Sequence, residues 1–105
     1  MLFRSPLSQF LQAASGRELI ARMLGNLREI HRSQCDWPRL LQVQARRVIL
    51  LPQAWEEHRD HALVLAELGS YASAAKSLSL YLRHCPDARD ASALLKHLAA
   101  WNGLH

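Results

Sequence analysis

The stretch ELGSYASAAKSLSLYLRHCP, from Glu67 to Pro86, decides the fold of this chain. Gly69 tolerates a positive φ and therefore predicts the end of one helix, while Pro86 predicts the end of the next. Between these two breaks, apolar residues recur at helical spacing: Ala74, Ala75, Leu78, Tyr81 and Leu82. We therefore predict a helix from Tyr71 to His84 that follows a tight turn.

The same order of residue types occurs 34 residues earlier in the chain. Trp37 matches Tyr71 and Pro52 matches Pro86, and weaker matches at the same offset are Leu40 with Ala74, Val48 with Leu82, Ile30 with Val64, and Asn26 with Asp60. A period of 34 residues is typical of the tetratricopeptide repeat, in which each unit is a pair of antiparallel helices. The alternative is an ordinary five-helix bundle in which this match arose by chance.

The predicted repeat units span about residues 21–53 and 55–86. The second unit follows the tetratricopeptide pattern well. The first is degenerate, because Leu40 stands where Ala is usual and Cys35 stands where Gly is usual. A capping helix over about residues 87–101, with Asp87 or Asp90 at its start, would cover one end of the stack.

Helical patterns extend over the rest of the chain. We expect a helix over 16–33 that begins with Ser15 as N-cap and Glu18 in a capping box, and a second helix that Asp36 caps. A third should run from about residue 54 to 68. The inward stripe of the first helix would be Leu19, Ile20, Met23, Leu24, Leu27 and Ile30.

Residues 1–14 form a separate N-terminal segment with amphipathic spacing, and they resemble neither a signal peptide nor a membrane span. No segment alternates with a period of two, so no sheet is expected. The predicted fold is all-α, with antiparallel helix pairs stacked as a short tetratricopeptide-like solenoid of about five to six helices over residues 15–105.

Composition narrows the possible partners. The chain has 105 residues, a formal charge of +4 and a pI near 9.7. Its arginines are dispersed among acidic residues, and the only tight basic pair is Arg46 with Arg47, whereas nucleic-acid binders usually cluster their positive charge. Cys35 and Cys85 lie far apart and fit no metal spacing, which favours reduced thiols in the cytoplasm.

Residues 15–101 resemble the C-terminal tetratricopeptide pair of the bacterial SirB-type family. The shared motifs are R-M-L-x-N-L (22–27), D-W (36–37), R-D (59–60), L-G (68–69) and Y-L-x-x-x-P-D-A (81–88). Members of that family typically join a transglutaminase-like domain to this tail. Residues 1–14 are too short to hold such a domain, so the resemblance transfers no catalytic residue to this chain.

Other residues with reactive side chains carry no convincing site. His58 and His61 share one helical face, but a metal site needs a third ligand and only Glu57 is near. Neighbouring residues on a helix do not face each other, so His84 and Cys85 form no nucleophile pair. We therefore predict no enzyme activity, no catalytic residue, no metal and no cofactor.

The expected function is a protein-interaction module that binds a peptide or a protein partner on the concave face of the stack. The first helix of each unit would line that face, and its partner-binding side chains would be Arg22, Asn26, Glu29, Arg32, Arg59, Asp60 and Leu63. Two alternatives remain open. One is a self-associating structural or regulatory domain, such as a homodimer, because two units cannot cover both ends of their stack. The other, less favoured, is a basic helical nucleic-acid binder.

Overall fold

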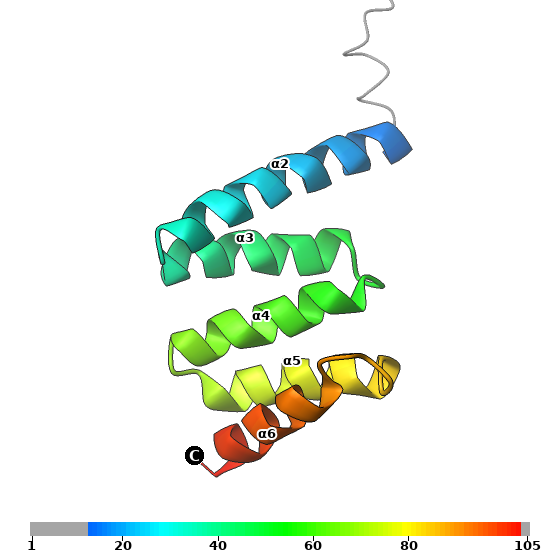
Figure 1. Cartoon of the computed structure of the whole chain (residues 1–105). Helices are drawn as coiled ribbons and strands as arrows, with labels where there is room; N and C mark the ends of the chain where they lie inside the picture. The colour runs from blue at the N-terminus through cyan, green and yellow to red at the C-terminus, as the bar shows by residue number, and fades with distance from the viewer. Residues whose placement is uncertain (1–12, 104–105) are drawn as a thin grey trace, which may run out of the picture.

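Five α-helices form a single stack in which each helix packs against the next (Figure 1). The computed structural model describes residues 13–103. The helices are α2 (Ala13–Ser33), α3 (Trp37–Leu50), α4 (Trp55–Glu67), α5 (Tyr71–His84) and α6 (Ala91–Asn102). Within 13–103 there is no strand, and no helix is long and apolar enough to cross a bilayer. The prediction of an all-α helical repeat is therefore confirmed.

The 34-residue offset is present in the backbone as well as in the residue types. Helices α3 and α5 both have 14 residues and begin at Trp37 and Tyr71. Their N-cap residues have the same φ of −87°, and their C-cap residues, Leu51 and Cys85, have φ values of −125° and −132°. Helices α3 and α5 thus begin and end with the same local backbone geometry.

The turns inside the two helix pairs also match. Cys35 and Gly69 each follow the end of a helix with a positive φ, 54° and 82°. The next N–H group, of Asp36 or Ser70, donates to a carbonyl five residues back at 2.9 Å in both turns. This is the Schellman arrangement that closes a helix with a left-handed residue. Cys35 therefore occupies the glycine position of the first unit, as its place in the repeat predicts.

The hydrophobic core lies where α4, α5 and α6 meet. Ala62 of α4 and Ala74 of α5 are fully buried, since small side chains allow these two helices to approach closely. Leu78 fills the centre, and Trp101 of α6 covers the end of the cluster. The first pair has the larger Leu40 at the position of Ala74, and Leu40 is also buried.

Helix α2 departs from the prediction in two respects. It begins at Ala13, so Ser15 lies inside the helix and is not its N-cap, because Ala13 and Ala14 are strong helix formers that extend it. Much of its apolar stripe is also exposed: the relative exposures are 49% for Ile20, 56% for Met23, 41% for Leu27 and 48% for Ile30. The reason is that α3 contacts another side of the helix, where Arg47 of α3 bonds to the carbonyl of Ala21 and lies against Gly25.

The predicted helix caps and apolar positions are confirmed in part. Asp36 caps α3, since its carboxylate accepts from the Arg39 N–H at 3.3 Å. Asp90, and not Asp87, precedes α6. Leu68 and Leu95 are exposed although both are apolar. The N-terminal segment expected over 1–14 lies almost entirely outside the described residues.

Candidate functional site: the concave face

An open groove of about 590 Å³ runs along the face formed by the first helix of each pair and by α6. Helix α2 contributes Arg28 and Arg32, α4 contributes residues from Asp60 to Glu67, and α6 contributes His97 and Trp101. The apolar part of the groove is formed by Trp37, Leu40, Leu63, Val64, Ala66, Tyr71 and Trp101. The groove thus combines aromatic walls with a polar edge.

Three of the seven partner-binding residues expected from the sequence line this groove: Arg32, Asp60 and Leu63. Glu29 lies beside them and pairs with Arg32 at 2.6 Å. Arg59 is half-buried outside the lining, where its guanidinium group bonds to other side chains of the protein.

Arg22 and Asn26 lie apart from the other five. Both are exposed on α2 and neither lines the groove. Asp60 does not bond to Asn26, its match in the repeat; its carboxylate pairs with Arg28 at 3.8 Å and with Arg59 at 3.0 Å. The concave residues of the two units are therefore connected through arginines.

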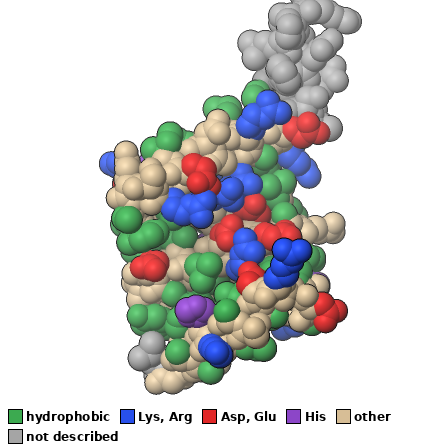
Figure 2. Space-filling view, viewed as in Figure 1, with side chains coloured by type: hydrophobic (Ala, Val, Ile, Leu, Met, Phe, Trp, Pro, Cys, Tyr) green, Lys and Arg blue, Asp and Glu red, His purple; other side chains and the backbone are tan. Residues whose placement is uncertain are grey.

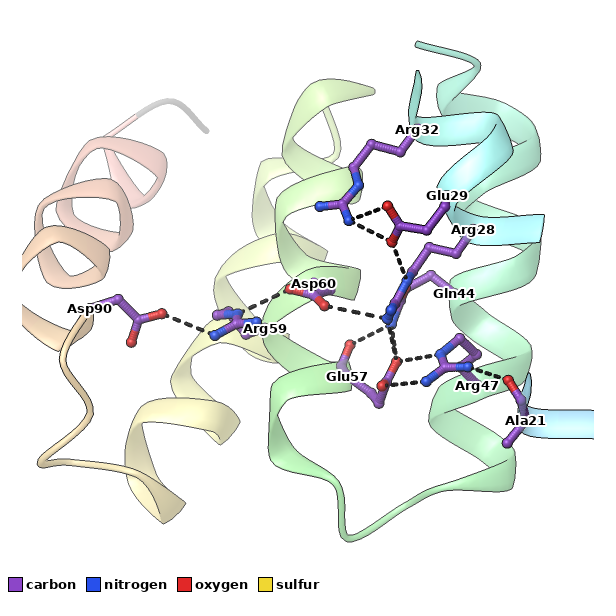
Figure 3. Close-up of polar contacts among 10 residues, drawn as sticks. All are labelled: Ala21, Arg28, Glu29, Arg32, Gln44, Arg47, Glu57, Arg59, Asp60 and Asp90. Carbon is purple, nitrogen blue, oxygen red and sulfur yellow. Dashed lines mark hydrogen bonds and ion pairs between the residues drawn. The ribbon is translucent and has the colours of Figure 1, made fainter. Parts of the chain in front are cut away.

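A chain of alternating charges crosses the concave face from α2 to the start of α6 (Figure 3). Arg28 is 3.4 Å from Glu29 and 3.8 Å from Asp60. Arg59 continues the chain, bonding to Asp60 at 3.0 Å and to Asp90 at 3.2 Å. Figure 2 shows basic and acidic side chains side by side across the middle of this face, with hydrophobic side chains around them.

Beneath this chain, Glu57 of α4 accepts four hydrogen bonds from α3. Arg47 donates to both carboxylate oxygens of Glu57 at 2.8 Å, and Gln44 donates to its carboxylate at 2.7 Å and to its backbone carbonyl at 3.0 Å. Arg47 also donates to the carbonyl of Ala21 in α2 at 2.6 Å. Glu57, Gln44 and Arg47 are all buried, so this cluster joins three helices in a region largely shielded from solvent.

These contacts shift the acidity of several groups. Burial raises the pKa of the Glu57 carboxyl, but the hydrogen bonds from Arg47 and Gln44 outweigh it and hold the pKa below the ordinary value. Burial lowers the pKa of Arg59, but hydrogen bonding and charge attraction to Asp60 outweigh it and raise the pKa. Burial lowers the pKa of His61, with a further contribution from His58. The charged states of Glu57 and Arg59 hold α4 to α3 and to the residue before α6.

The buried cluster was missed from the sequence. In the sequence, Glu57 stands near His58 and His61, and Arg47 stands beside Arg46 in the tight basic pair; neither of these sequence contexts predicts a buried ion pair. The positions of the two residues along the helices could have indicated the cluster. Helices α3 and α4 are neighbours, and Gln44, Arg47 and Glu57 lie on the sides of these helices that face each other. Gly25 gave a second signal: a Cβ there would lie 3.3 Å from the Arg47 guanidinium, so glycine makes room for it.

The charged and aromatic side chains of this face already contact one another. The arginines contact carboxylates, and the ring of His97, which also lines the groove, stacks on Trp101 with 5.8 Å between centroids. His58 bonds to the Pro52 carbonyl at 3.0 Å. Within residues 13–103, no three His, Cys, Asp or Glu side chains are placed to hold a metal ion.

Comparison with known families agrees with the geometry of the stack. The family model of the tetratricopeptide repeat matches residues 27–99, which include both helix pairs from within α2 to within α6. The chain belongs to the tetratricopeptide repeat family. Such repeats are typically non-catalytic and bind other proteins, which is the class of function that the groove fits.

Two curated relatives are UPF0162 proteins of Xylella fastidiosa, one from strain 9a5c and one from strain Temecula1. Each is 29% identical to this chain over 92 residues, which is 88% of this chain and 33% of the relative. The chain thus spans about a third of the length of the curated relatives it matches. No solved structure matches it significantly.

Proposed function

We propose that this tetratricopeptide protein is a non-enzymatic interaction module whose concave groove binds a peptide segment of a partner protein. The observation that carries this proposal is the groove itself, about 590 Å³ in volume and lined from all five described helices. A volume of that size accommodates several side chains of an extended or helical peptide. Because the walls come from both units, one bound peptide would contact both.

The chemistry of the lining favours a peptide with mixed character. Trp37, Tyr71 and Trp101 offer flat apolar surface, which gives binding energy at low entropic cost. Arg32, whose charge is already shared with Glu29 at 2.6 Å, offers hydrogen-bond donors at one edge, and Glu67 offers an anion at another. We infer that the bound segment inserts an apolar or aromatic side chain between the aromatic walls, accepts hydrogen bonds from Arg32 and pairs a positive charge with Glu67.

The charge pattern disfavours a nucleic-acid partner. Phosphate-backbone binding needs several unpaired cations, and its affinity falls steeply as salt is added. On this face Arg28, Arg32 and Arg59 each already contact a carboxylate. A phosphate backbone would have to displace those carboxylates.

The resemblance to the SirB-type tail refines the proposal. We propose that this chain performs the interaction role of such a tail and carries no catalytic role of its own. Arg59 and Asp60, the R-D pair of that resemblance, are bonded to each other and join α4 to the start of α6. We place the protein in the cytoplasm, because Cys35 and Cys85 both remain free thiols.

Peptide selection on the full chain tests the groove directly. A random peptide library displayed on phage is selected against the wild-type chain, and the affinity of the best synthetic peptides is measured by calorimetry. Leu63→Ala and Arg32→Ala, in the groove, should weaken binding by about tenfold or more, as expected when a central contact is removed. Lys76→Ala, exposed on α5 outside the groove, is the matched control and should leave affinity unchanged.

Two outcomes would contradict the proposal. One is selected peptides that bind the two groove variants as tightly as wild type. The other is a loss of affinity in Lys76→Ala equal to that of the groove variants. Thermal unfolding of each variant shows whether the fold is retained, which matters most for the half-buried Leu63.

A further inference from the structure

The floor of the concave groove holds a buried amide whose oxygen is unpaired. Gln44 lines the groove and is fully buried. Its Nε2 donates to the carboxylate of Glu57 at 2.7 Å and to the Glu57 backbone carbonyl at 3.0 Å, which fixes the orientation of the amide. Within residues 13–103, no donor reaches the Oε1 of Gln44. An unpaired buried acceptor costs free energy, so a ligand that brings a donor to this oxygen would be stabilised there.

Arg28 supplies the complementary donor beside Gln44. Arg28 also lines the groove, and its Nη1 lies 3.5 Å from the same Glu57 oxygen to which Gln44 donates, so the two side chains end next to each other (Figure 3). The Nε of Arg28 is buried and has no hydrogen-bond partner in the described part of the chain. The carboxylate of Glu29 is 3.4 Å from it, beyond the usual length of such a bond. An unpaired donor and an unpaired acceptor thus lie side by side in the groove.

The charges around Arg28 and Gln44 are already balanced. The network there pairs four arginines with four carboxylates: Arg28, Arg32, Arg47 and Arg59 with Glu29, Glu57, Asp60 and Asp90. A ligand carboxylate would be repelled by this network's acidic side chains and would leave the Oε1 of Gln44 unpaired, whereas an ammonium group would leave the Nε of Arg28 unpaired. The site therefore suits a neutral group that carries both a donor and an acceptor.

We propose that Arg28 and Gln44 form a subsite of the groove that binds the side-chain carboxamide of an asparagine or glutamine in the bound peptide. The carboxamide N–H donates to the Oε1 of Gln44, and the carboxamide oxygen accepts from the Nε of Arg28. A side chain fits better than peptide backbone, because Gln44 is buried at the floor while the backbone of a bound segment would run along the open groove above it. Since the contacts of Arg28 to carboxylates are 3.4 to 3.8 Å long, its guanidinium group can shift to admit the carboxamide.

This inference rests on the proposed function of the groove, and parallel selections test it. The displayed peptide library is selected against the full chain as wild type, as Gln44→Met and as Gln42→Met. Methionine has a volume similar to that of glutamine and lacks Oε1; Gln42, exposed on the same helix outside the groove lining, provides the matched control. Wild type and Gln42→Met should select Asn or Gln at one fixed position of the peptide, and Gln44→Met should show no such preference. The same preference with Gln44→Met, or none with wild type, overturns the proposal.

Calorimetry with paired synthetic peptides measures the contact itself. One peptide is taken from the wild-type selection, and in its comparison peptide the selected Gln or Asn is replaced by Met or Leu. Wild type should bind the carboxamide peptide about tenfold more tightly, whereas Gln44→Met should bind both peptides equally. Both peptides are measured on the same folded variant, so a change in its stability does not imitate the lost discrimination. Equal affinities of the two peptides for wild type would contradict the subsite.

Arg28→Lys tests the donor with the charge retained. Lysine keeps a positive charge among the carboxylates but lacks Nε, so this variant should also lose most of the discrimination between the paired peptides. Leu63→Ala separates the two proposals: if it weakens peptide binding while replacement of the carboxamide does not, the groove function stands and the subsite is wrong. If wild type selects no peptide at all, both proposals fail.

Discussion

Cys35 stands 34 residues before Gly69, and both close the turn of a helix pair with a left-handed backbone. Their φ values are 54° and 82°, and they are the residues in 13–103 whose backbone has a positive φ. Glycine adopts this conformation without strain, whereas a side chain crowds the neighbouring carbonyl. The first turn therefore keeps the geometry of the repeat at an energetic cost that the second turn avoids.

Cys35→Gly should stabilise the protein by about 1 kcal/mol, because it removes that strain at an exposed site where no packing is lost. Equilibrium unfolding in urea measures the change. Gly69→Ala is the converse control: no atom lies within 4 Å of the added Cβ, so backbone strain alone should destabilise the fold by about 1–2 kcal/mol. A Cys35→Gly variant less stable than wild type would show that the cysteine side chain contributes a contact of its own.

Glu57→Gln should destabilise the protein by about 3 kcal/mol or more, since it leaves the buried Arg47 guanidinium without its counter-charge. Urea unfolding at neutral pH measures the loss. Glu56→Gln, at the exposed neighbouring position, is the matched control and should change stability little.

A double replacement distinguishes the net stabilisation by the Arg47–Glu57 ion pair from the cost of leaving one of its charges unpaired. Arg47→Met with Glu57→Leu removes both charges and fills the same space, so it should recover most of the stability lost in Glu57→Gln. If the double variant is less stable than Glu57→Gln, then the ion pair itself contributes a large net stabilisation, and the expectation is wrong.

Stability should fall with acidification in two steps. The folded-state pKa of His61 is lowered from 6.5, so the unfolded chain takes up the proton first. Its contribution is therefore complete above pH 6.5 and is lost as pH falls from there towards the lower folded-state pKa. The folded-state pKa of Glu57 is lowered from 4.5, so its contribution is lost below pH 4.5 by the same argument.

The pH dependence of the unfolding free energy, measured by urea titration between pH 3 and 8, resolves these steps. His61→Gln should flatten the first step and Glu57→Gln the second. Profiles of the two variants that run parallel to wild type across both regions would disprove the assignment.

Tyr81→Phe should destabilise the fold by about 1 kcal/mol and loosen α6 in particular. The Tyr81 hydroxyl donates to Asp90, the residue before α6, at 3.0 Å, and the ring is buried in the core. Hydrogen exchange should show faster exchange of the α6 amides. Tyr71→Phe, in the groove wall, is the matched control; equal acceleration in both variants would mean that the bond to Asp90 does not hold α6.

The period of the repeat was readable because its signals are local. Gly69, Pro52 and Pro86 act on the backbone at or next to their own positions, and apolar spacing defines a helical side without reference to other helices. The bounds of α5 were predicted to the residue for this reason. The predicted start of α2 was wrong because Ala13 and Ala14 extend the helix towards the N-terminus, beyond Ser15, the expected N-cap.

The groove was anticipated only in outline. Its position follows from which helix of each pair faces inward, a rule of the repeat. The bonding partners of its residues do not follow from that rule, because Arg28, Asp60 and Arg59 each have several carboxylates or arginines within reach. Which pairs form depends on distances across helices, and the sequence contains no such distances.

By itself, the sequence determined that the chain is a stack of helix pairs with a 34-residue step, since residues close in the chain set turns and helix ends. Only the tertiary structure decided that Glu57 and Arg47 are buried together, and that the apolar stripe of α2 faces outward. Burial is a property of what lies beside a residue in space. For these residues the deciding neighbours come from other helices, or are missing from the described part of the stack.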